Sequence, residues 1–179
     1  EMACRVALSD YHEKGDLIYR FLILGFRIGK DVVNHLSNDV VNQVVKINRN
    51  VGREVHHFLG FLRFSQLENG VLVSVIHPKN NIISLLAPHF ADRLPEEKFV
   101  IFDGFRNICA LHMPGNPWIL SDLPDMDDNV IRQLENNDLY KDLWKVFFEN
   151  IAVRERINLK LQRNNLPLRY RKDMTEFMP

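Results

Sequence analysis

Three side chains that could bind an anion, a metal ion or a proton lie together in residues 51–61, VGREVHHFLGF. They are Arg53, His56 and His57. An imidazole ligates divalent metals and serves as an acid or base near neutral pH, and a guanidinium binds phosphate oxygens. A cation in the last helical turn is also stabilised by the helix dipole, by about 0.3–1 kcal/mol. The stretch is therefore a metal site, an acid–base site, a phosphate contact, or a helix end closed by Gly60.

A second group of candidate residues lies in residues 88–93, PHFADR. His89 and Asp92, three positions apart, could share a helix face, although Asp92 and Arg93 could equally form a helix-end ion pair. Together with His56 they offer two imidazoles and a carboxylate, which suits Zn, Fe or Mn. No HxH, HExxH or CxxC spacing supports such a site. We therefore predict no bound metal, and His56, His89 and Asp92 remain catalytic candidates.

Other reaction chemistries lack a sequence signal. Cys4 and Cys109 are far apart and form no CxxC motif, which argues against a disulfide framework and favours a reducing cytosol. There is no Gly-x-Ser-x-Gly, no GxGxxG or Walker sequence, and no three-cysteine cluster for a 4Fe–4S site. We predict no cofactor, and the sequence leaves open whether the protein is an enzyme.

Charge is segregated along a chain whose formal net charge is zero. Acidic residues gather at Asp122, Asp125, Asp127, Asp128, Glu135, Asp138 and Asp142. Basic residues gather at Arg154, Arg156, Lys160, Arg163, Arg169, Arg171 and Lys172. The basic segment also holds Tyr170, and cations with one aromatic ring suit a nucleic acid. The alternative is a solvated strap whose arginines pair with the acidic segment.

A phosphate-facing surface would form if the basic tail folded back on the first set of cations. Arginine has the planar fork that suits phosphate oxygens. The predicted nucleic-acid-binding residues are Arg49, Arg53, His56, His57, Arg63, Arg93, Arg163, Arg169, Tyr170 and Lys172.

The elements that must position these residues follow from hydrophobic periodicity and turn signals. Helical spacing predicts helices at 16–36 and 40–59, and we expect Gly25 and Gly29 to let another helix approach closely. Asn69-Gly70 predicts a hairpin over residues 61–78. Further predicted elements are a helix with Pro88 at 80–94, strands at 99–103, 107–113 and 118–120, and a helix at 137–156.

Strands grouped in runs, without strict alternation with helices, favour an α+β fold with an antiparallel sheet of about four to five strands packed with several helices. With 179 residues and 46% hydrophobic content, we expect a single domain over 1–179. Its basic segment 154–179 would strap or extend it. No stretch suits a membrane span or signal peptide, so we expect a cytoplasmic protein. Because the chain begins at Glu1, we also expect the natural protein to extend further at its N-terminus.

Three long stretches resemble a bacterial family of uncharacterised DNA metabolism proteins: VGREVHHFLGFLRFSQLENGVL, LLAPHFADR and LWKVFFENIAVRERINLKLQRNNLPLRYRKDMTEF. The resemblance runs from about Asp16 to Phe177. It implies a role in DNA repair or modification beside a radical-SAM DNA-repair protein, and fusion in some members to a uracil-DNA glycosylase-like domain. It implies no particular reaction.

The family's motifs match this chain at three places: Gly52, Arg53, Glu54 and His56; Pro88 to Arg93; and Pro167, Arg169 and Tyr170. Three departures stand out. His57 occupies a place where Arg or Lys is expected, which favours a positive group over a metal ligand. Phe102 occupies a place where His is common, and Arg171 one that is usually aromatic.

These observations lead to an expected function and two alternatives. We expect a DNA repair or modification accessory protein that binds nucleic acid, or docks to a radical-SAM or glycosylase partner, through its basic residues. One alternative is an enzyme that acts on nucleic acid with His56, His89 and Asp92. The other is an adaptor that binds only protein.

Overall fold

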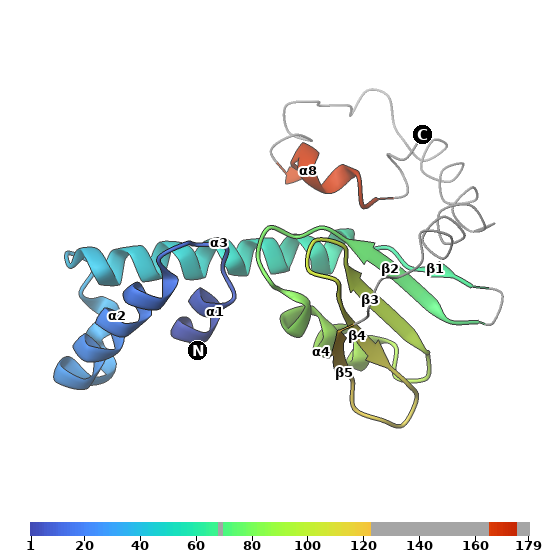
Figure 1. Cartoon of the computed structure of the whole chain (residues 1–179), viewed down its shortest axis with the longest axis horizontal. Coiled ribbons are helices and arrows are strands. Elements are labelled where there is room, and N and C mark those ends of the chain that lie inside the picture. Colours follow the sequence, from blue (N-terminus) through green and yellow to red (C-terminus); the bar gives the residue numbers. More distant parts are fainter. Residues whose placement is uncertain (68–69, 123–164, 175–179) are drawn as a thin grey trace. The chain divides into compact units, whose positions relative to one another are not determined.

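The computed structural model describes residues 1–67, 70–122 and 165–174 (Figure 1). Contacts divide them into two compact units. Unit 1 contains residues 1–56 and 78–82, and unit 2 contains residues 57–77 and the described residues from 83 onward. A domain can hold two such units, so the expectation of a single domain stays a prediction.

Unit 1 is helical and is built from α1 (Met2–Ala7), α2 (Lys14–Ile28), the 3-10 helix η1 (Gly29–Asn34) and most of α3 (Asp39–Phe61). Its core consists of Val6, Leu17, Phe21, Val32, Val41, Val44 and Val45. Asn38 caps α3, because its Oδ1 accepts hydrogen bonds from the backbone N–H groups of Val40 and Val41. The predicted helix at 40–59 is confirmed, whereas α1 was not predicted.

The helix predicted over 16–36 is shorter in the structure. Gly29 has φ +82°, a left-handed conformation that ends α2, and η1 follows. A Cβ added at Gly25 would lie 3.9 Å from Val32 Cγ1, an ordinary contact, and one added at Gly29 would meet nothing within 4 Å. Among the described residues no other helix approaches these two glycines closely, and Gly29 serves instead to end α2.

Unit 2 is built on a five-stranded sheet with the order β1-β2-β3-β4-β5 (Figure 1). Its strands are β1 (Ser65–Gln66), β2 (Leu72–Ile76), β3 (Phe99–Asp103), β4 (Ile108–His112) and β5 (Ile119–Asp122). The α+β class and the strand number are confirmed. The sheet is mixed, since β2 and β3 are parallel while the other pairs are antiparallel.

The parallel pair follows from its connection, because parallel neighbours need a crossover and α4 (Ile83–Arg93) lies between β2 and β3 in the chain. Phe64 joins α4 to the sheet, since its ring contacts those of Phe90 and Phe99. Pro88 lies inside α4, as predicted. The last described element is α8 (Leu168–Arg171). The helix predicted at 137–156 falls outside the described residues.

Among the described residues, every helix is too short or too polar to cross a membrane.

Candidate functional site

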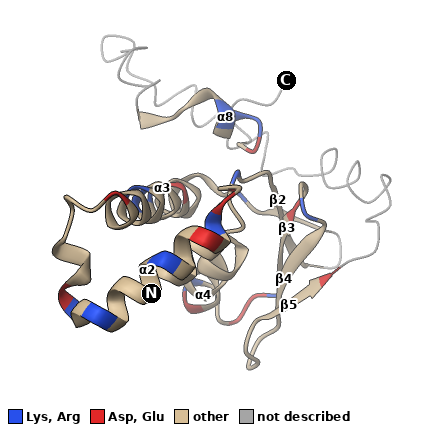
Figure 2. Cartoon of the chain, turned by 60° about the vertical axis from the view of Figure 1, so that its left-hand side comes forward, with Lys and Arg blue, Asp and Glu red and all other residues tan. Residues whose placement is uncertain are grey.

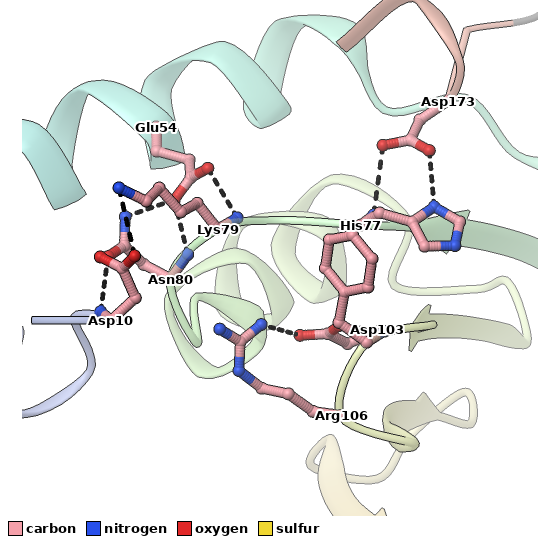
Figure 3. Close-up of polar contacts among 9 residues, drawn as sticks. Asp10, Glu54, His77, Lys79, Asn80, Asp103, Arg106 and Asp173 are labelled. Carbon is pink, nitrogen blue, oxygen red and sulfur yellow. Dashed lines mark hydrogen bonds and ion pairs between the residues drawn. The ribbon is translucent and has the colours of Figure 1, made fainter. Parts of the chain in front are cut away.

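Glu54, from the Gly-Arg-Glu-x-His stretch, anchors a loop in unit 1 (Figure 3). Its carboxylate, in a side chain only 2% exposed, accepts hydrogen bonds from the backbone N–H groups of Lys79 and Asn80, at 2.9 Å each, and from the Asn80 side-chain amide. The Asn80 Oδ1 accepts a bond from the Asp10 backbone N–H, and Lys79 Nζ lies 3.1 Å from Asp10 Oδ2. Glu54 is therefore structural, because it satisfies buried donors of residues 79 and 80.

Gly52 lies on the packed side of the same helix. A Cβ added there would come within 3.3 Å of Arg5 Nη1. Glu54 of this stretch is therefore explained by its buried hydrogen bonds and Gly52 lies beside the Arg5 side chain, whereas Arg53 and His56 are exposed.

The exposed side of α3 in unit 1 carries a row of basic residues, which we call the α3 cationic face: Lys46, Arg49, Arg53 and His56. At 3.6 residues per turn these four positions fall within about 80° of arc. The acidic residues of α3 are Asp39, in its first turn, and the buried Glu54. Within the described part of the chain, Lys46, Arg49 and Arg53 have no ion-pair partner. Figure 2 shows the lysines and arginines of α3 in blue.

The other predicted cations belong to unit 2 or to its undescribed part. Arg63 donates hydrogen bonds from Nη1 to the carbonyl oxygens of Gly60 (2.9 Å) and Leu62 (3.2 Å), so it satisfies carbonyls at the end of α3. Arg93 is exposed in the last turn of α4. Arg163 lies outside the described residues.

Tyr170 is packed inside unit 2. Its side chain is 2% exposed, and its ring lies 5.1 Å from those of His57 and Phe58 and 5.9 Å from that of Phe61. Arg169 covers the ring at 4.7 Å and donates a 2.6 Å hydrogen bond to the phenol oxygen. A nucleic-acid role for Tyr170 stays a prediction. In this structure its ring is buried against the rings of His57, Phe58 and Phe61.

A second cluster of residues, which was not predicted from the sequence, lies where the parallel strands β2 and β3 end. We call it the strand-end cluster: His77, Asp103, Gly104, Phe105, Arg106, Lys172 and Asp173. The buried Asp173 carboxylate binds His77 twice, with Oδ1 2.8 Å from the imidazole Nδ1 and Oδ2 3.2 Å from the backbone nitrogen (Figure 3). This pair fixes the imidazole beside the sheet.

Asp103 organises the turn that carries the rest of this cluster. Its side chain is fully buried and accepts hydrogen bonds from the Phe105 backbone N–H (2.9 Å) and from Arg106 Nη1 (2.8 Å). A Cβ on Gly104 would lie 2.5 Å from His77 Nε2, so only glycine fits there without a shift. The turn thereby presents Phe105 to solvent.

Phe105 is 64% exposed and has two polar neighbours. The Lys172 ammonium lies 4.7 Å from its ring centroid, and the His77 ring packs against it edge to face with centroids 5.2 Å apart. This arrangement was not predicted from the sequence, although Asp-Gly after a buried strand, in FVIFDGFRN, indicated the turn that carries it.

The catalytic candidates form no metal centre in the part of the chain described. His89 and Asp92 are both exposed on α4 in unit 2, and His56 belongs to unit 1. No group of three or more histidine, cysteine, aspartate or glutamate side chains in residues 1–67, 70–122 and 165–174 could hold a metal ion. A catalytic role for His56, His89 and Asp92 stays a prediction.

Cys109 has no sign of activation as a nucleophile. Burial raises the pKa of its thiol above the ordinary value, and the nearby Asp122 acts in the same direction. A backbone hydrogen bond of Ser121 acts in the opposite direction and lowers the pKa, but to a smaller extent than burial raises it. The group therefore remains a neutral thiol at neutral pH.

A cavity of about 520 Å³ lies in unit 2 along β3, β4 and β5, and its lining contains none of the predicted site residues. It is lined by Val71, Lys98, Phe99, Val100, Leu111, His112, Met113, Asn116, Pro117 and Ile119.

A family model described as a domain of unknown function, DUF4130, matches residues 12–176, nearly the whole chain. Neither the curated proteins nor the solved structures contain a significant match. The expected relationship to an uncharacterised domain family is therefore confirmed.

Proposed function

The chain belongs to the DUF4130 family, and from this premise we propose that the protein is a DNA repair or modification accessory protein that binds DNA through the α3 cationic face. The observation that carries the proposal is the row formed by Lys46, Arg49 and Arg53, exposed and without a carboxylate partner among the described residues. The setting in DNA metabolism is supported by the resemblance of its motifs.

The dimensions of this face suit a phosphate backbone. At a rise of 1.5 Å per residue, positions 46 to 56 cover about 15 Å along the helix, comparable with several successive phosphates of one strand. Arg49 and Arg53 have guanidinium forks that bind phosphate oxygens in pairs, and Lys46 adds a point charge. Because Glu54 is held in its buried site, it does not oppose these charges at the surface.

The proposal is tested by measuring affinity for duplex DNA over a range of salt concentration. Each neutralised phosphate adds about 0.9 to the steepness of log K against log salt on duplex DNA. Replacing both Arg49 and Arg53 by alanine should therefore make the plot shallower by about 1.8 and lower the affinity. A matched control removes the same charge from α2 of the same unit, by Arg20→Ala with Arg27→Ala, and should change the slope little.

Two results would reject this proposal. One is an unchanged slope in the Arg49/Arg53 variant. The other is binding that does not depend on salt at all, which would favour the adaptor that binds only protein.

The partner enzyme is the second part of the proposal, and it is supported by the resemblance alone. A radical-SAM DNA-repair protein or a uracil-DNA glycosylase-like domain would perform the chemistry while this protein holds the DNA. Measurement of binding to each purified candidate partner tests this part. If neither candidate binds and the purified protein contains stoichiometric metal, the alternative of an enzyme with His56, His89 and Asp92 is favoured.

A further inference from the structure

We propose that the strand-end cluster of unit 2 binds an unpaired nucleobase, with Phe105 as the stacking surface. This inference rests on the proposed function for the identity of the ligand as DNA. It adds a site that contacts a base, whereas the α3 cationic face is proposed to contact only the phosphate backbone of DNA.

Phe105 is held in place before any ligand arrives. Its backbone N–H bonds to the fully buried Asp103 carboxylate, which also binds Arg106. Two backbone hydrogen bonds, from the N–H groups of Arg106 and Asn107 to the Asp103 carbonyl, close the turn. An aromatic ring on a fixed turn stacks a ligand with little loss of conformational entropy.

The charges beside the ring suit a polyanion. The carboxylates of Asp103 and Asp173 are buried and engaged by Arg106 and His77, respectively. Lys172 is the exposed charged residue of the cluster and lies over Phe105. A ring next to a cation suits a nucleotide, because the ring stacks the base and the cation attracts the adjoining phosphate.

His77 supplies a hydrogen-bond acceptor next to this ring. A carboxylate only accepts hydrogen bonds, so the contact with Asp173 places a proton on Nδ1 of the imidazole. In neutral histidine Nε2 is then an acceptor. Within the described part of the chain Nε2 has no hydrogen-bond partner. It can therefore accept a hydrogen bond from the exocyclic amino group of adenine, cytosine or guanine.

The experiment compares two DNA duplexes that each contain one unpaired nucleotide at the same position. In one duplex this nucleotide carries a base, and in the other it is a stable abasic residue. The wild-type chain should bind the base-containing oligonucleotide about 5- to 150-fold more tightly, the range for stacking one base. Phe105→Ala should remove this difference and leave affinity for the abasic oligonucleotide unchanged.

Phe26→Ala is the matched control, because Phe26 is 88% exposed on α2 and lies outside the cluster. It should preserve the difference between the two oligonucleotides. Phe105→Leu serves as a second variant: it keeps an apolar side chain but removes the ring, so it should resemble Phe105→Ala.

The outcomes separate this inference from the proposed function. Salt-dependent binding that needs Arg49 and Arg53, but with no difference between base and abasic residue, would overturn the inference alone. The same holds if Phe105→Ala binds both oligonucleotides like the wild type, and the ring would then be assigned to a protein partner. Absence of any oligonucleotide binding would overturn both proposals.

His77→Asn tests the acceptor separately from the ring, because the amide nitrogen of asparagine can replace Nδ1 as the donor to Asp173 while no atom takes the place of Nε2. The variant should still stack a base, but it should lose any preference for adenine, cytosine or guanine over thymine at the unpaired position. An unchanged order of preference would remove His77 from the proposed site and leave Phe105 in it.

Discussion

Both carboxylate oxygens of Asp173 bind a single residue, His77, which lies 96 positions earlier in the chain. One oxygen contacts the imidazole and the other accepts the backbone N–H. This double contact secures the described C-terminal residues 165–174 to the end of β2. It also fixes which imidazole nitrogen carries the proton.

Replacing Asp173 by asparagine should loosen residues 165–174. The amide has one acceptor oxygen, so its NH₂ group would face one of the two His77 donors. A buried donor left unsatisfied costs about 1–3 kcal/mol. Hydrogen exchange of these residues should become faster, while Leu168→Ala, at an exposed position of α8, should change it little. Equal exchange in both variants would contradict a securing role for Asp173.

A methyl group at Gly104 should displace His77. The added Cβ would lie 2.5 Å from Nε2 and 2.8 Å from Cδ2 of the imidazole, so the ring or the turn must move. We expect Gly104→Ala to lower the free energy of unfolding by about 1–3 kcal/mol, as overpacking does. Denaturant unfolding measures this loss. Gly60→Ala is the control, because a Cβ there meets nothing within 4 Å. A Gly104 variant as stable as the Gly60 variant would show that the site is not tightly packed.

Glu54 should be more important for stability than its charge suggests. In Glu54→Gln the amide nitrogen would replace one acceptor oxygen and face the N–H groups of Lys79 or Asn80. The expected loss in free energy of unfolding is about 1–3 kcal/mol, measured by urea denaturation. Glu96→Gln, at an exposed position, should be neutral within about 0.5 kcal/mol. Similar stabilities of the two variants would argue against loop anchoring by Glu54.

Cys109 should make the protein less stable at high pH. Burial raises the pKa of its thiol in the folded protein, so the unfolded chain loses this proton at lower pH than the folded one. The contribution of this group is full below the unfolded pKa, about 8.5, and is lost as pH rises through the folded pKa. Unfolding measured between pH 7 and pH 10 should show a steeper decline in the wild type than in Cys109→Ala.

The reactivity of the two cysteines provides a simpler check of the same burial. Cys4 is exposed and Cys109 is buried. A thiol reagent should modify Cys4 first, and Cys109 only after denaturation. Modification of both thiols at equal rates in the folded protein would contradict the burial of Cys109.

Local patterns predicted most of the described elements. Hydrophobic periodicity located α3 and α4, and Asn69-Gly70 located the hairpin of β1 and β2. The same periodicity failed after Ile28, because apolar spacing continues into η1 while the left-handed Gly29 ends the helix. The direction of β3 beside β2 was missed, although a strand, a helix and a strand in succession indicate a parallel pair.

The strand-end cluster could not be predicted in the same way. Its histidine and the aspartate that binds it are brought together by the tertiary fold, and neither residue has a local signal for the other. The burial of Tyr170 has a related cause: its cationic neighbours in the sequence carry no signal for its packing against Phe58 and Phe61, which the tertiary fold brings about. The composition of the basic segment therefore indicates its charge, but it does not indicate which side chains of the short helix α8 are buried.

The membership of residues 78–82 in unit 1 has a practical consequence for dissecting the protein. A fragment ending at His56 would lack Lys79 and Asn80 and would leave the Glu54 carboxylate without its three donors. A fragment extended to Ile82 would carry residues 57–77 without the remainder of their sheet. No single truncation point yields two intact pieces, and during synthesis unit 1 stays incomplete until after the whole of β1 and β2 has been made.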